Sequence, residues 1–433
     1  MNGRTKLAGR AVYLVDGART PFIKARTEPG PFRASDLAVW AGQALLARQP
    51  FGPAALDEVI LGCIAPTADE VNIGRVAALR LDCGDRVPAW TVQRNCASGM
   101  QALDSAAQSI AGGRAELVLA GGTEAMSHAP VLWDTPAVAW LGRISSARSP
   151  LERAKAIAGF RPGYMKPVIG LLRGLTDPVV GLSMGQTAEI LAARFGLTRA
   201  MLDAYAVTSH ERLAAAQAAG RLGEIVPIID ARGRVHDHDD GVRPDSSVEK
   251  LAKLKPVFDR EFGLVTAGNS AQITDGAAWL LLASEEALAK HGLTPLARLV
   301  DVEWAGLDPR QMGLGPVHAI APLLARRALS LEDVEYLEIN EAFAAQVLAC
   351  LAAAADPHYC RGALGLEQAL GPIDAARLNV DGGAIALGHP VGASGARIVL
   401  HLAHVLAARG ARRGIAAICI GGGQGGAMLL ERE

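Results

Sequence analysis

Cys96 has the sequence setting of a nucleophile. It lies in the segment 95–99, Asn-Cys-Ala-Ser-Gly, between a stretch at 91–94 that is expected to be extended and a helix expected over 97–110. The amide groups at a helix N-terminus carry partial positive charge, which stabilises a thiolate over a thiol. Such a thiolate can attack a carbonyl carbon and hold an acyl group as a thioester. The alternative is a small buried cysteine that only packs, and the local sequence leaves both roles open.

Three more residues could take part in the same chemistry. His389 stands between a glycine and a proline, which places it on a shaped loop, and imidazole exchanges protons near neutral pH. Cys419 ends an apolar strand expected at 415–418. Asn340 follows a strand expected over 334–339, where it could orient a water molecule or simply form a turn. None of the three is assigned from its own context, because a single histidine or turn residue is more often structural than catalytic.

The glycine-rich run at 421–426 admits two interpretations. Its letters match the Gly-x-Gly-x-x-Gly pattern of dinucleotide-binding proteins. Only seven residues follow it, which is too few for the phosphate-binding helix, the next strand and the ribose-binding acid. The run is better explained as a loop that brings backbone N–H groups close to a ligand oxyanion.

Alternating strands and helices must position these residues. Apolar runs typical of strands, such as 58–62 and 116–120, alternate with Ala- and Leu-rich stretches typical of helices, such as 37–48. The tripeptide Ala-Ser-Gly at 97–99 recurs at 393–395, and each copy precedes a helix, an apolar strand and a Gly-Gly pair. This preserved order predicts an internal duplication into two α/β halves whose strands are buried on both faces.

Composition narrows the class of protein. The 433 residues are enough for two or three domains, and the net charge of −1 lacks the basic footprint of nucleic-acid binding. No apolar run reaches the roughly 18 residues that a membrane-spanning helix needs. Six cysteines without a Cys-x-x-Cys pair predict neither a disulfide scaffold nor a zinc ribbon. We therefore expect a cytoplasmic protein with no metal site, no transmembrane segment and no nucleic-acid partner.

Taken together, four segments resemble the motifs of the thiolase family. They are Asn-Cys-Ala-Ser-Gly at 95–99, Asn-Glu-Ala-Phe at 340–343, Gly-His-Pro at 388–390 and Cys-Ile-Gly-Gly-Gly at 419–423, and their order and spacing match over nearly the whole chain. The resemblance implies an α/β thiolase fold, in which two duplicated βαβαβαββ halves form a five-layered α-β-α-β-α core with a loop domain. It also implies a homo-oligomer, usually a dimer of dimers.

The resemblance implies a role for each motif residue. Cys96 would take up the acyl group, His389 would activate Cys96 or incoming coenzyme A, and Cys419 would move the proton at the acetyl α-carbon. His389 with a water held by Asn340 would form one oxyanion hole, and the backbone N–H groups of Cys96 and Gly421 the other. The implied reaction is cleavage of a 3-ketoacyl-CoA by CoA into acetyl-CoA and a shortened acyl-CoA, or the reverse Claisen condensation.

The resemblance also implies that coenzyme A is a cosubstrate and that no cofactor is bound permanently. Met184 and Phe343 lie in segments that match the family, and Arg243 matches a family position near the CoA phosphates, where a cation is physically reasonable. Ser270 stands next to the position of a CoA-contacting hydroxyl. Ser183 replaces the histidine of many acetoacetyl-specific members, so the chain looks more like the degradative and trifunctional-β-type thiolases of fatty acid β-oxidation.

Two other functions compete with this interpretation. A decarboxylating ketoacyl synthase shares the fold and the nucleophilic cysteine, but it lacks the second cysteine, so Cys419 and the Asn-Glu-Ala-Phe segment favour a thiolase. A catalytically silent acyl-CoA-binding subunit would keep the pocket without the chemistry. Labelling with iodoacetamide would distinguish a working thiol from a silent one.

The middle of the chain departs from the repeat pattern. We expect a loop or cap domain at 128–259, between a first half at 1–127, completed by about 260–294, and a second half at 295–433. Within the cap, the segment 141–178 holds seven cations and two anions, a net charge of +5. It could dock an acidic partner such as a β-oxidation subunit or an anionic membrane. It could equally be a solvated cap that attracts CoA phosphates.

Overall fold

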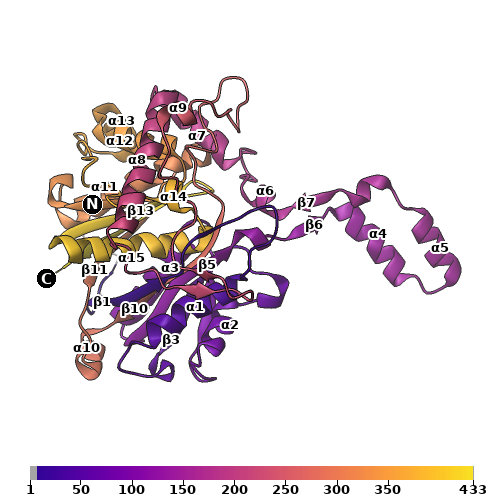
Figure 1. Cartoon of the computed structure of the whole chain (residues 1–433), viewed down its shortest axis with the longest axis horizontal. Coiled ribbons are helices and arrows are strands. Elements are labelled where there is room, and N and C mark those ends of the chain that lie inside the picture. Colours follow the sequence, from indigo (N-terminus) through magenta and orange to yellow (C-terminus); the bar gives the residue numbers. More distant parts are fainter. Residues whose placement is uncertain (1–6, 433) are drawn as a thin grey trace.

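The computed structural model describes residues 7–432, and its centre is a mixed sheet to which each half of the chain contributes (Figure 1). The first half supplies, in spatial order, β1 (Val12–Arg19), β10 (Thr274–Ala283), β5 (Leu117–Ala125), β3 (Glu58–Gly62) and β4 (Ala89–Val92). The second half supplies β11 (Ala297–Gly306), β14 (Gln424–Glu431), β13 (Arg413–Ile420) and β12 (Tyr336–Ile339). The two groups are joined by antiparallel pairing of β1 with β11.

The strand pairing repeats between the halves. β1 pairs antiparallel with β10, β10 antiparallel with β5, and β5 parallel with β3. In the same order, β11 pairs antiparallel with β14, β14 antiparallel with β13, and β13 parallel with β12. Even the irregularity repeats, because the register shifts between Leu14 and Asp16 in β1 and between Leu299 and Asp301 in β11. The predicted duplication is therefore confirmed in the fold.

Helices form three layers around the strands (Figure 1). The outer layers are α1 (Ala34–Leu46) and α2 (Ile73–Arg80) on the first half, and α11 (Gly315–Arg327) and α12 (Ala344–Ala355) on the second. The central layer is α3 (Ser98–Ala111) with α15 (Val391–Arg409), whose side chains share one apolar core with strands of both halves. Among the described residues, α15 alone is long and apolar enough to cross a membrane, but it is mostly buried in this core.

The two central helices begin side by side. A Cβ atom on Gly99 would lie 2.8 Å from the carbonyl oxygen of Gly392, and one on Gly122 would clash with the same oxygen. Glycine is required at these positions because the backbones of α3, α15 and β5 approach closely. Since Cys96 precedes α3 and His389 precedes α15, this contact brings the two predicted catalytic loops together.

An arm leaves the core between β5 and α7 (Figure 1). Its stalk is the antiparallel ribbon of β6 (Val131–Trp133) and β7 (Pro167–Ile169), and its head is a hairpin of α4 (Thr135–Ser146) and α5 (Pro150–Ala158). The rings of Trp140, Phe160 and Tyr164 contact one another inside the hairpin. The indole N–H of Trp140 donates to the carbonyl of Ala156 at 2.8 Å, which fixes the two helices to each other.

The remaining elements surround the site or connect the layers. The helices are α6 (Gly170–Gly174), α7 (Met184–Arg194), α8 (Arg199–Ala218), α9 (Val248–Leu251), α10 (Glu285–His291), α13 (Pro357–Leu364) and α14 (Ala384–Leu387). The short strands are β2 (Ile23–Lys24), β8 (Ile228–Ile229) and β9 (Val235–His236). The 3-10 segments are η1 (Pro53–Ala55), η2 (Ala68–Glu70), η3 (Met126–His128), η4 (Pro162–Met165), η5 (Pro309–Leu314) and η6 (Leu331–Asp333).

Candidate active site

Seven of the nine residues predicted from the sequence line one cavity of about 520 Å³. They come from both halves and from the segment between them: Cys96, Met184, Arg243, Ser270, Phe343, His389 and Cys419. Asn340 is fully buried and Gly421 is at the end of β13, and neither is part of the cavity wall. The fold thus places two thiols and one imidazole around one space.

Cys96 lies on a tight elbow between β4 and α3. Asn95 has a left-handed backbone (φ 43°), and the hydroxyl of Ser98 donates to the Asn95 carbonyl at 2.7 Å while it accepts the Arg94 N–H at 2.9 Å. Cys96 is half-buried, whereas the other five cysteines are buried. This elbow presents its sulfur to the cavity at the start of the central helix.

The electrostatics of Cys96 differ from the sequence expectation. The backbone N–H groups of Gly421 and of Cys96 itself lower the pKa of the thiol, as expected near a helix N-terminus. Burial raises that pKa by more than these bonds lower it, so the net pKa of Cys96 lies above its usual value. The prediction of a resting thiolate is therefore wrong, and the nucleophile needs a base.

His389 can be that base. Its Nδ1 lies 2.6 Å from the hydroxyl of Ser394, and that hydroxyl donates its own proton to the Pro390 carbonyl at 3.0 Å. Ser394 must then accept from Nδ1–H, which leaves Nε2 unprotonated. Nε2 has no hydrogen-bond partner among residues 7–432. Burial, with the nearby Arg397, lowers the pKa of His389 to about 4, so the ring is neutral at neutral pH.

We expect the acid limb of kcat/KM to lie near pH 4 instead of near 6.5. His389 can take a proton only while it is neutral, and its lowered pKa keeps it neutral down to about 4. Activity should therefore be lost as the pH falls through about 4 and not before. The measurement is a pH profile of kcat/KM, with circular dichroism at each pH to exclude acid unfolding. A limb centred at the ordinary histidine pKa would contradict this environment for His389.

Cys419 is a second, deeper thiol. It lies at the end of β13 and is 1% exposed. Burial raises its pKa well above the usual value, and the neighbouring Cys96 and Cys350 raise it further. A thiol in this state holds its proton firmly, so it can donate that proton only to a strongly basic atom such as a carbanion.

Asn340, two residues before the cavity-lining Ala342, has an unused amide. Neither its Oδ1 nor its Nδ2 has a hydrogen-bond partner in the described part of the chain, although the residue is fully buried. Its neighbour Glu341 is firmly held, since the carboxylate accepts from Tyr205, Ser209 and the N–H of Ile385. Unpaired polar atoms of this kind are uncommon in folded proteins and mark candidate functional groups.

Two cations line the wall of the cavity, Lys24 and Arg243. Arg243 was predicted, whereas Lys24 was missed, because it enters only through the pairing of β2 with β10. The pKa of Lys24 is lowered by burial and then by Arg243 and Arg26, which shows that these cations lie close together. Such a pair is suited to bind phosphate groups.

The root of the arm forms the apolar part of the wall, which the sequence analysis also missed. Met126 stands where β5 leads into the stalk, and Leu172 and Leu175 stand where the chain returns from it. No sequence pattern marks these residues, since their position depends on the ribbon between them. The arm and the cavity are therefore parts of one continuous segment.

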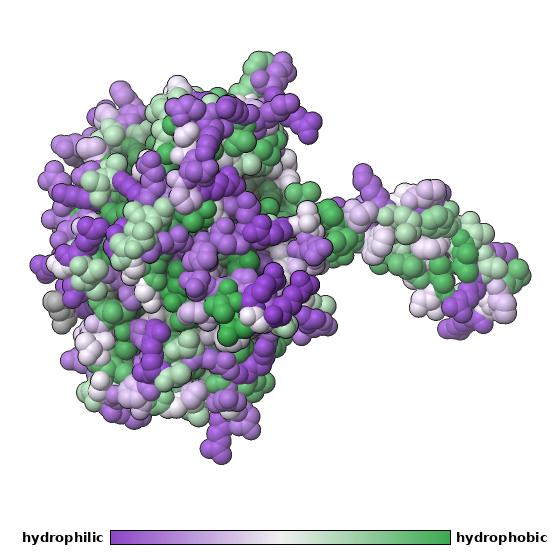
Figure 2. Space-filling view, in the orientation of Figure 1, coloured by the Kyte–Doolittle hydropathy of each residue, from purple (hydrophilic) through white to green (hydrophobic). Residues whose placement is uncertain are grey.

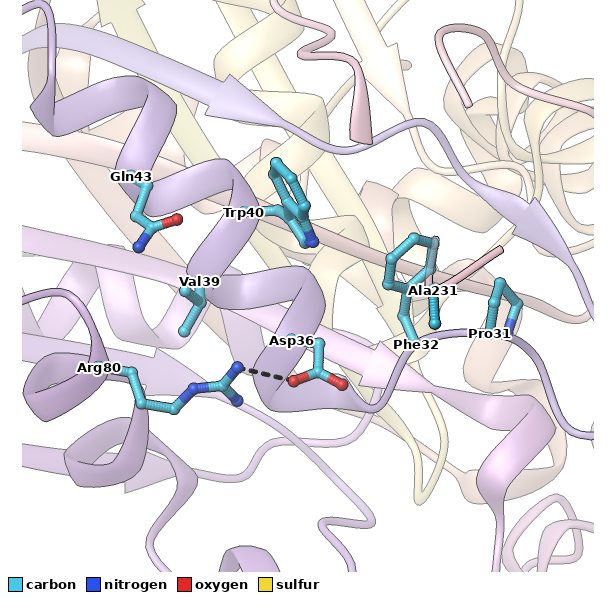
Figure 3. A pocket seen from close by; sticks show the side chains of 8 residues that line it. All are labelled: Pro31, Phe32, Asp36, Val39, Trp40, Gln43, Arg80 and Ala231. Atoms are coloured by element: carbon cyan, nitrogen blue, oxygen red, sulfur yellow. Dashed lines mark hydrogen bonds and ion pairs between the residues drawn. The ribbon is translucent and has the colours of Figure 1, made fainter. Parts of the chain in front are cut away.

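A second cavity, of about 490 Å³, lies on the outer face of α1 (Figure 3). Trp40 and Phe32 form its apolar side, and Arg80 is paired with Asp36 at 2.7 Å. It contains no thiol or imidazole, and none of the predicted site residues lies in its wall. We assign the chemistry to the first cavity.

Comparison with known proteins covers both halves. The model of the thiolase N-terminal domain matches residues 12–286, and that of the thiolase C-terminal domain matches residues 293–432. The β-ketoadipyl-CoA thiolase of Pseudomonas aeruginosa is 41% identical over 430 residues, which cover 98% of this chain and 99% of that protein. The mitochondrial 3-ketoacyl-CoA thiolase of Homo sapiens is 37% identical, with 98% of each chain covered.

Solved structures agree in fold. Human mitochondrial 3-ketoacyl-CoA thiolase in complex with CoA has a TM-score of 0.83 at 38% identity, with 98% of both chains covered. An acetyl-CoA acetyltransferase from Syntrophomonas wolfei has a TM-score of 0.85 at 33% identity, with 98% of this chain and 100% of the other covered. These matches confirm the fold predicted from the motifs and decide against a decarboxylating ketoacyl synthase. The chain belongs to the thiolase family.

Proposed function

We propose that this acyltransferase cleaves 3-ketoacyl-CoA with CoA, or runs the reverse condensation, through an acyl group held on Cys96. The observation that carries the proposal is the convergence of two thiols and an imidazole with a free Nε2 on one cavity. A single thiol would suffice for acyl transfer alone. A second, high-pKa thiol is what carbon–carbon cleavage additionally needs, because a carbanion must be protonated.

The first half-reaction forms the acyl-enzyme. His389 Nε2 takes the Cys96 proton as the sulfur attacks the ketone carbon, and the N–H groups of Cys96 and Gly421 hold the resulting oxyanion. The bond between the α-carbon and the former ketone carbon then breaks. Cys419 gives its proton to the α-carbon, so acetyl-CoA leaves while the shortened acyl group stays on Cys96. Nε2 of His389 and a water molecule held by the unpaired amide of Asn340 would stabilise the enolate oxygen that develops during this step.

The second half-reaction restores the resting site. The thiol of incoming CoA gives its proton to the Cys419 thiolate, and its sulfur attacks the acyl-thioester. The tetrahedral oxyanion is held by the same two N–H groups. When it collapses, Cys96 leaves as a thiolate and recovers its proton from His389. Protons and electron pairs balance over the cycle, and no bound cofactor is needed.

The substrate class follows from the lining of the cavity. Lys24 and Arg243 are suited to the CoA phosphates, whereas Met126, Leu172 and Leu175 offer an apolar wall to the acyl group. We therefore propose 3-ketoacyl-CoA of fatty acid β-oxidation as substrate. The curated relatives named as β-ketoadipyl-CoA thiolases supply the alternative, an acyl group with a terminal carboxylate. The two substrate classes are distinguished by comparing kcat/KM for the cleavage of acetoacetyl-CoA, a long-chain 3-ketoacyl-CoA and 3-ketoadipyl-CoA. A higher kcat/KM for 3-ketoadipyl-CoA would overturn the assignment of an apolar acyl group.

A homo-oligomer is supported by β4, the edge strand of the central sheet on the side of the first half. Within the described residues, β4 pairs on one side only, with β3, and Trp90 on it is exposed. An open strand edge is normally covered in a folded protein. We propose that a second copy covers it and that dimers assemble into a dimer of dimers, which analytical ultracentrifugation measures. The six unpaired cysteines support a cytoplasmic location for this assembly.

The domain division remains part of the proposal. We assign 1–127 with about 260–294 to the first thiolase half, 128–259 to a loop domain and 295–433 to the second half. The arm is the projecting part of the loop domain. The positive charge and the exposed side chains of the arm support a role in binding another molecule.

The arm carries the features of a docking element. Its exposed apolar side chains cannot be covered by a hairpin of two short helices, and Figure 2 shows hydrophobic and hydrophilic residues side by side on it. These apolar residues are Val138, Leu141, Leu151, Ile157, Phe160 and Met165. Cations flank them, and the segment 141–178 has a net charge of +5. We propose that the arm docks an acidic surface of a β-oxidation partner subunit.

Charge reversal on the arm is expected to release this partner without loss of catalysis. In the triple variant Arg148→Glu, Arg153→Glu and Arg161→Glu, hydratase and dehydrogenase activities of a host extract should no longer co-elute with the protein. Cleavage of acetoacetyl-CoA should stay within about twofold, because these residues lie far from the cavity wall. The matched control reverses the same amount of charge at exposed positions away from the arm: Arg232, Arg260 and Arg361.

The outcomes separate the possible occupants. Co-elution that the arm variant loses and the control keeps supports the partner subunit. Binding of anionic vesicles, or a change in the protein's own oligomeric state, would assign the arm to a membrane or to a second copy and overturn the partner assignment. Unchanged behaviour in all three assays would leave the arm as a solvated cap.

A further inference from the structure

The two N–H groups at the Cys96 sulfur come from different halves of the chain. One belongs to Cys96 itself, at the start of α3, and the other to Gly421, at the turn between β13 and β14. These positions are separated by more than three hundred residues, and no strand pairing joins the Cys96 elbow to the Gly421 turn. The position of the Gly421 N–H relative to the Cys96 N–H must therefore be fixed by another contact. Such a contact matters because a displacement of about 1 Å in a catalytic site lowers the rate by about a hundredfold.

Asn95 makes the connection. Its side-chain Nδ2 donates to the carbonyl oxygen of Gly421 at 2.7 Å, across the boundary between the halves. This bond holds the Gly421 carbonyl on Asn95, while the N–H of the same residue lowers the pKa of the Cys96 thiol. The turn is a three-residue loop between the paired residues Ile420 and Gln424, and Gly422 and Gly423 in it have left-handed backbones (φ 92° and 76°). The N–H of Leu307 holds the far side of the loop, at the Gly423 carbonyl, at 2.8 Å, whereas Asn95 holds the near side at Gly421.

We propose that Asn95 is a positioning residue that fixes the Gly421 N–H in the oxyanion hole of the acyl-enzyme. The inference rests on the proposed function, since it concerns the oxyanion formed on Cys96. Asn95 suits the role for two independent reasons. Asparagine tolerates the left-handed backbone that the elbow requires, at φ 43°. It also has a donor at the end of a short side chain, which glycine and aspartate lack.

A neighbouring contact crosses the same boundary between the two halves of the chain. The guanidinium of Arg94 lies 4.1 Å from the ring centroid of Trp304, which is on β11 of the second half. The elbow is therefore attached to the second half at two successive residues, by a cation–π contact and by the Asn95 amide. Only the amide reaches the residue that supplies the second oxyanion donor. Removal of the amide should therefore affect the chemistry more than the fold.

The deciding variant is Asn95→Gly. Glycine keeps the left-handed backbone and removes only the amide, so a purely conformational role predicts wild-type kinetics. The positioning role predicts that acylation of Cys96 by acetyl-CoA slows by about 10- to 100-fold, with KM nearly unchanged. Asn95→Asp keeps the shape but turns an acceptor toward the Gly421 carbonyl, and we expect a larger loss. The unfolding midpoint should stay close to that of the wild type in both.

A matched control uses another left-handed asparagine. Asn72 has φ 51°, and its amide donates to the Ala89 carbonyl at 3.3 Å, outside the cavity wall. Asn72→Gly removes the same kind of amide from the same kind of backbone and should acylate at the wild-type rate. Equal rates for Asn95→Gly and wild type would overturn the proposal.

A second measurement does not depend on turnover. The Gly421 N–H lowers the pKa of the Cys96 thiol, so its displacement should shift the pH midpoint of alkylation by iodoacetamide upward in Asn95→Gly. An unshifted midpoint would contradict the inference. If wild-type protein forms no acyl-enzyme at all, the proposed function fails, while the alkylation midpoint still tests the position of Gly421.

Discussion

Cys96→Ala is expected to abolish thiolysis of acetoacetyl-CoA, by about 10⁴-fold or more, because the variant has no atom on which the acyl group can be held. Intact-protein mass spectrometry after incubation with acetyl-CoA should show one added acetyl group on the wild type and none on the variant. The unfolding midpoint should change little, since Cys96 is only half-buried. The two measurements together separate loss of the nucleophile from loss of the fold.

A matched cysteine provides the control. Cys83 is buried, belongs to the apolar core beside α1 and α2, and lies outside the cavity wall. Cys83→Ala should keep both the acetyl adduct and turnover, although it loses some stability. An acetyl group that persists in Cys96→Ala would place the nucleophile elsewhere. A wild type that is never acetylated would favour the catalytically silent subunit.

Cys419→Ala is expected to separate the two halves of the reaction. Cys96 and His389 remain, so acetyl-CoA should still acetylate the enzyme. The group that exchanges a proton with the acetyl α-carbon is gone, so cleavage and condensation should fall by about 10³-fold. The specific measurement is exchange of the acetyl methyl protons of acetyl-CoA in deuterated water, followed by NMR. Wild type should exchange and the variant should not.

Two outcomes of the Cys419→Ala experiment would contradict the proposed role of Cys419 in proton transfer. If the variant retains exchange of the methyl protons, another group moves the α-proton and the assigned role is lost. If it loses acetylation as well, Cys419 supports the Cys96 site structurally, since Cys96 lies close enough to Cys419 to raise the pKa of that thiol. Cys350→Ala is a suitable control, because Cys350 is buried near Cys419 but lies outside the cavity wall.

The sequence predicted the strands of the fold better than their ends. The strand expected at 58–62 is found as Glu58–Gly62, but the one expected at 116–120 continues to Ala125. Its Gly-Gly pair was interpreted as a strand end. In the structure, Gly121 and Gly122 stay within the strand because β10 and the start of α15 approach too closely for any side chain. A glycine required by packing and one required by a turn look alike in a sequence.

The predicted site residues came from motifs, and the rest of the site did not. Motifs mark residues whose chemistry is specific, such as Cys96 or His389. Lys24 and Leu172 reach the cavity through a strand pairing and through the return of the arm, which only the folded chain creates. The net pKa of Cys96 was also misjudged, because the sequence indicated the helix start but not the burial that outweighs it.

The stalk of the arm has both ends in the wall of the cavity, at Met126 and at Leu172. On the proposed function, one insert therefore holds both the residues that would contact the acyl group and those that would contact a neighbouring molecule. The groups that break and form bonds lie outside that insert. In evolutionary terms, such a chain can acquire a different acyl preference and a different neighbour by exchange of a single surface segment, while its reaction chemistry is inherited unchanged.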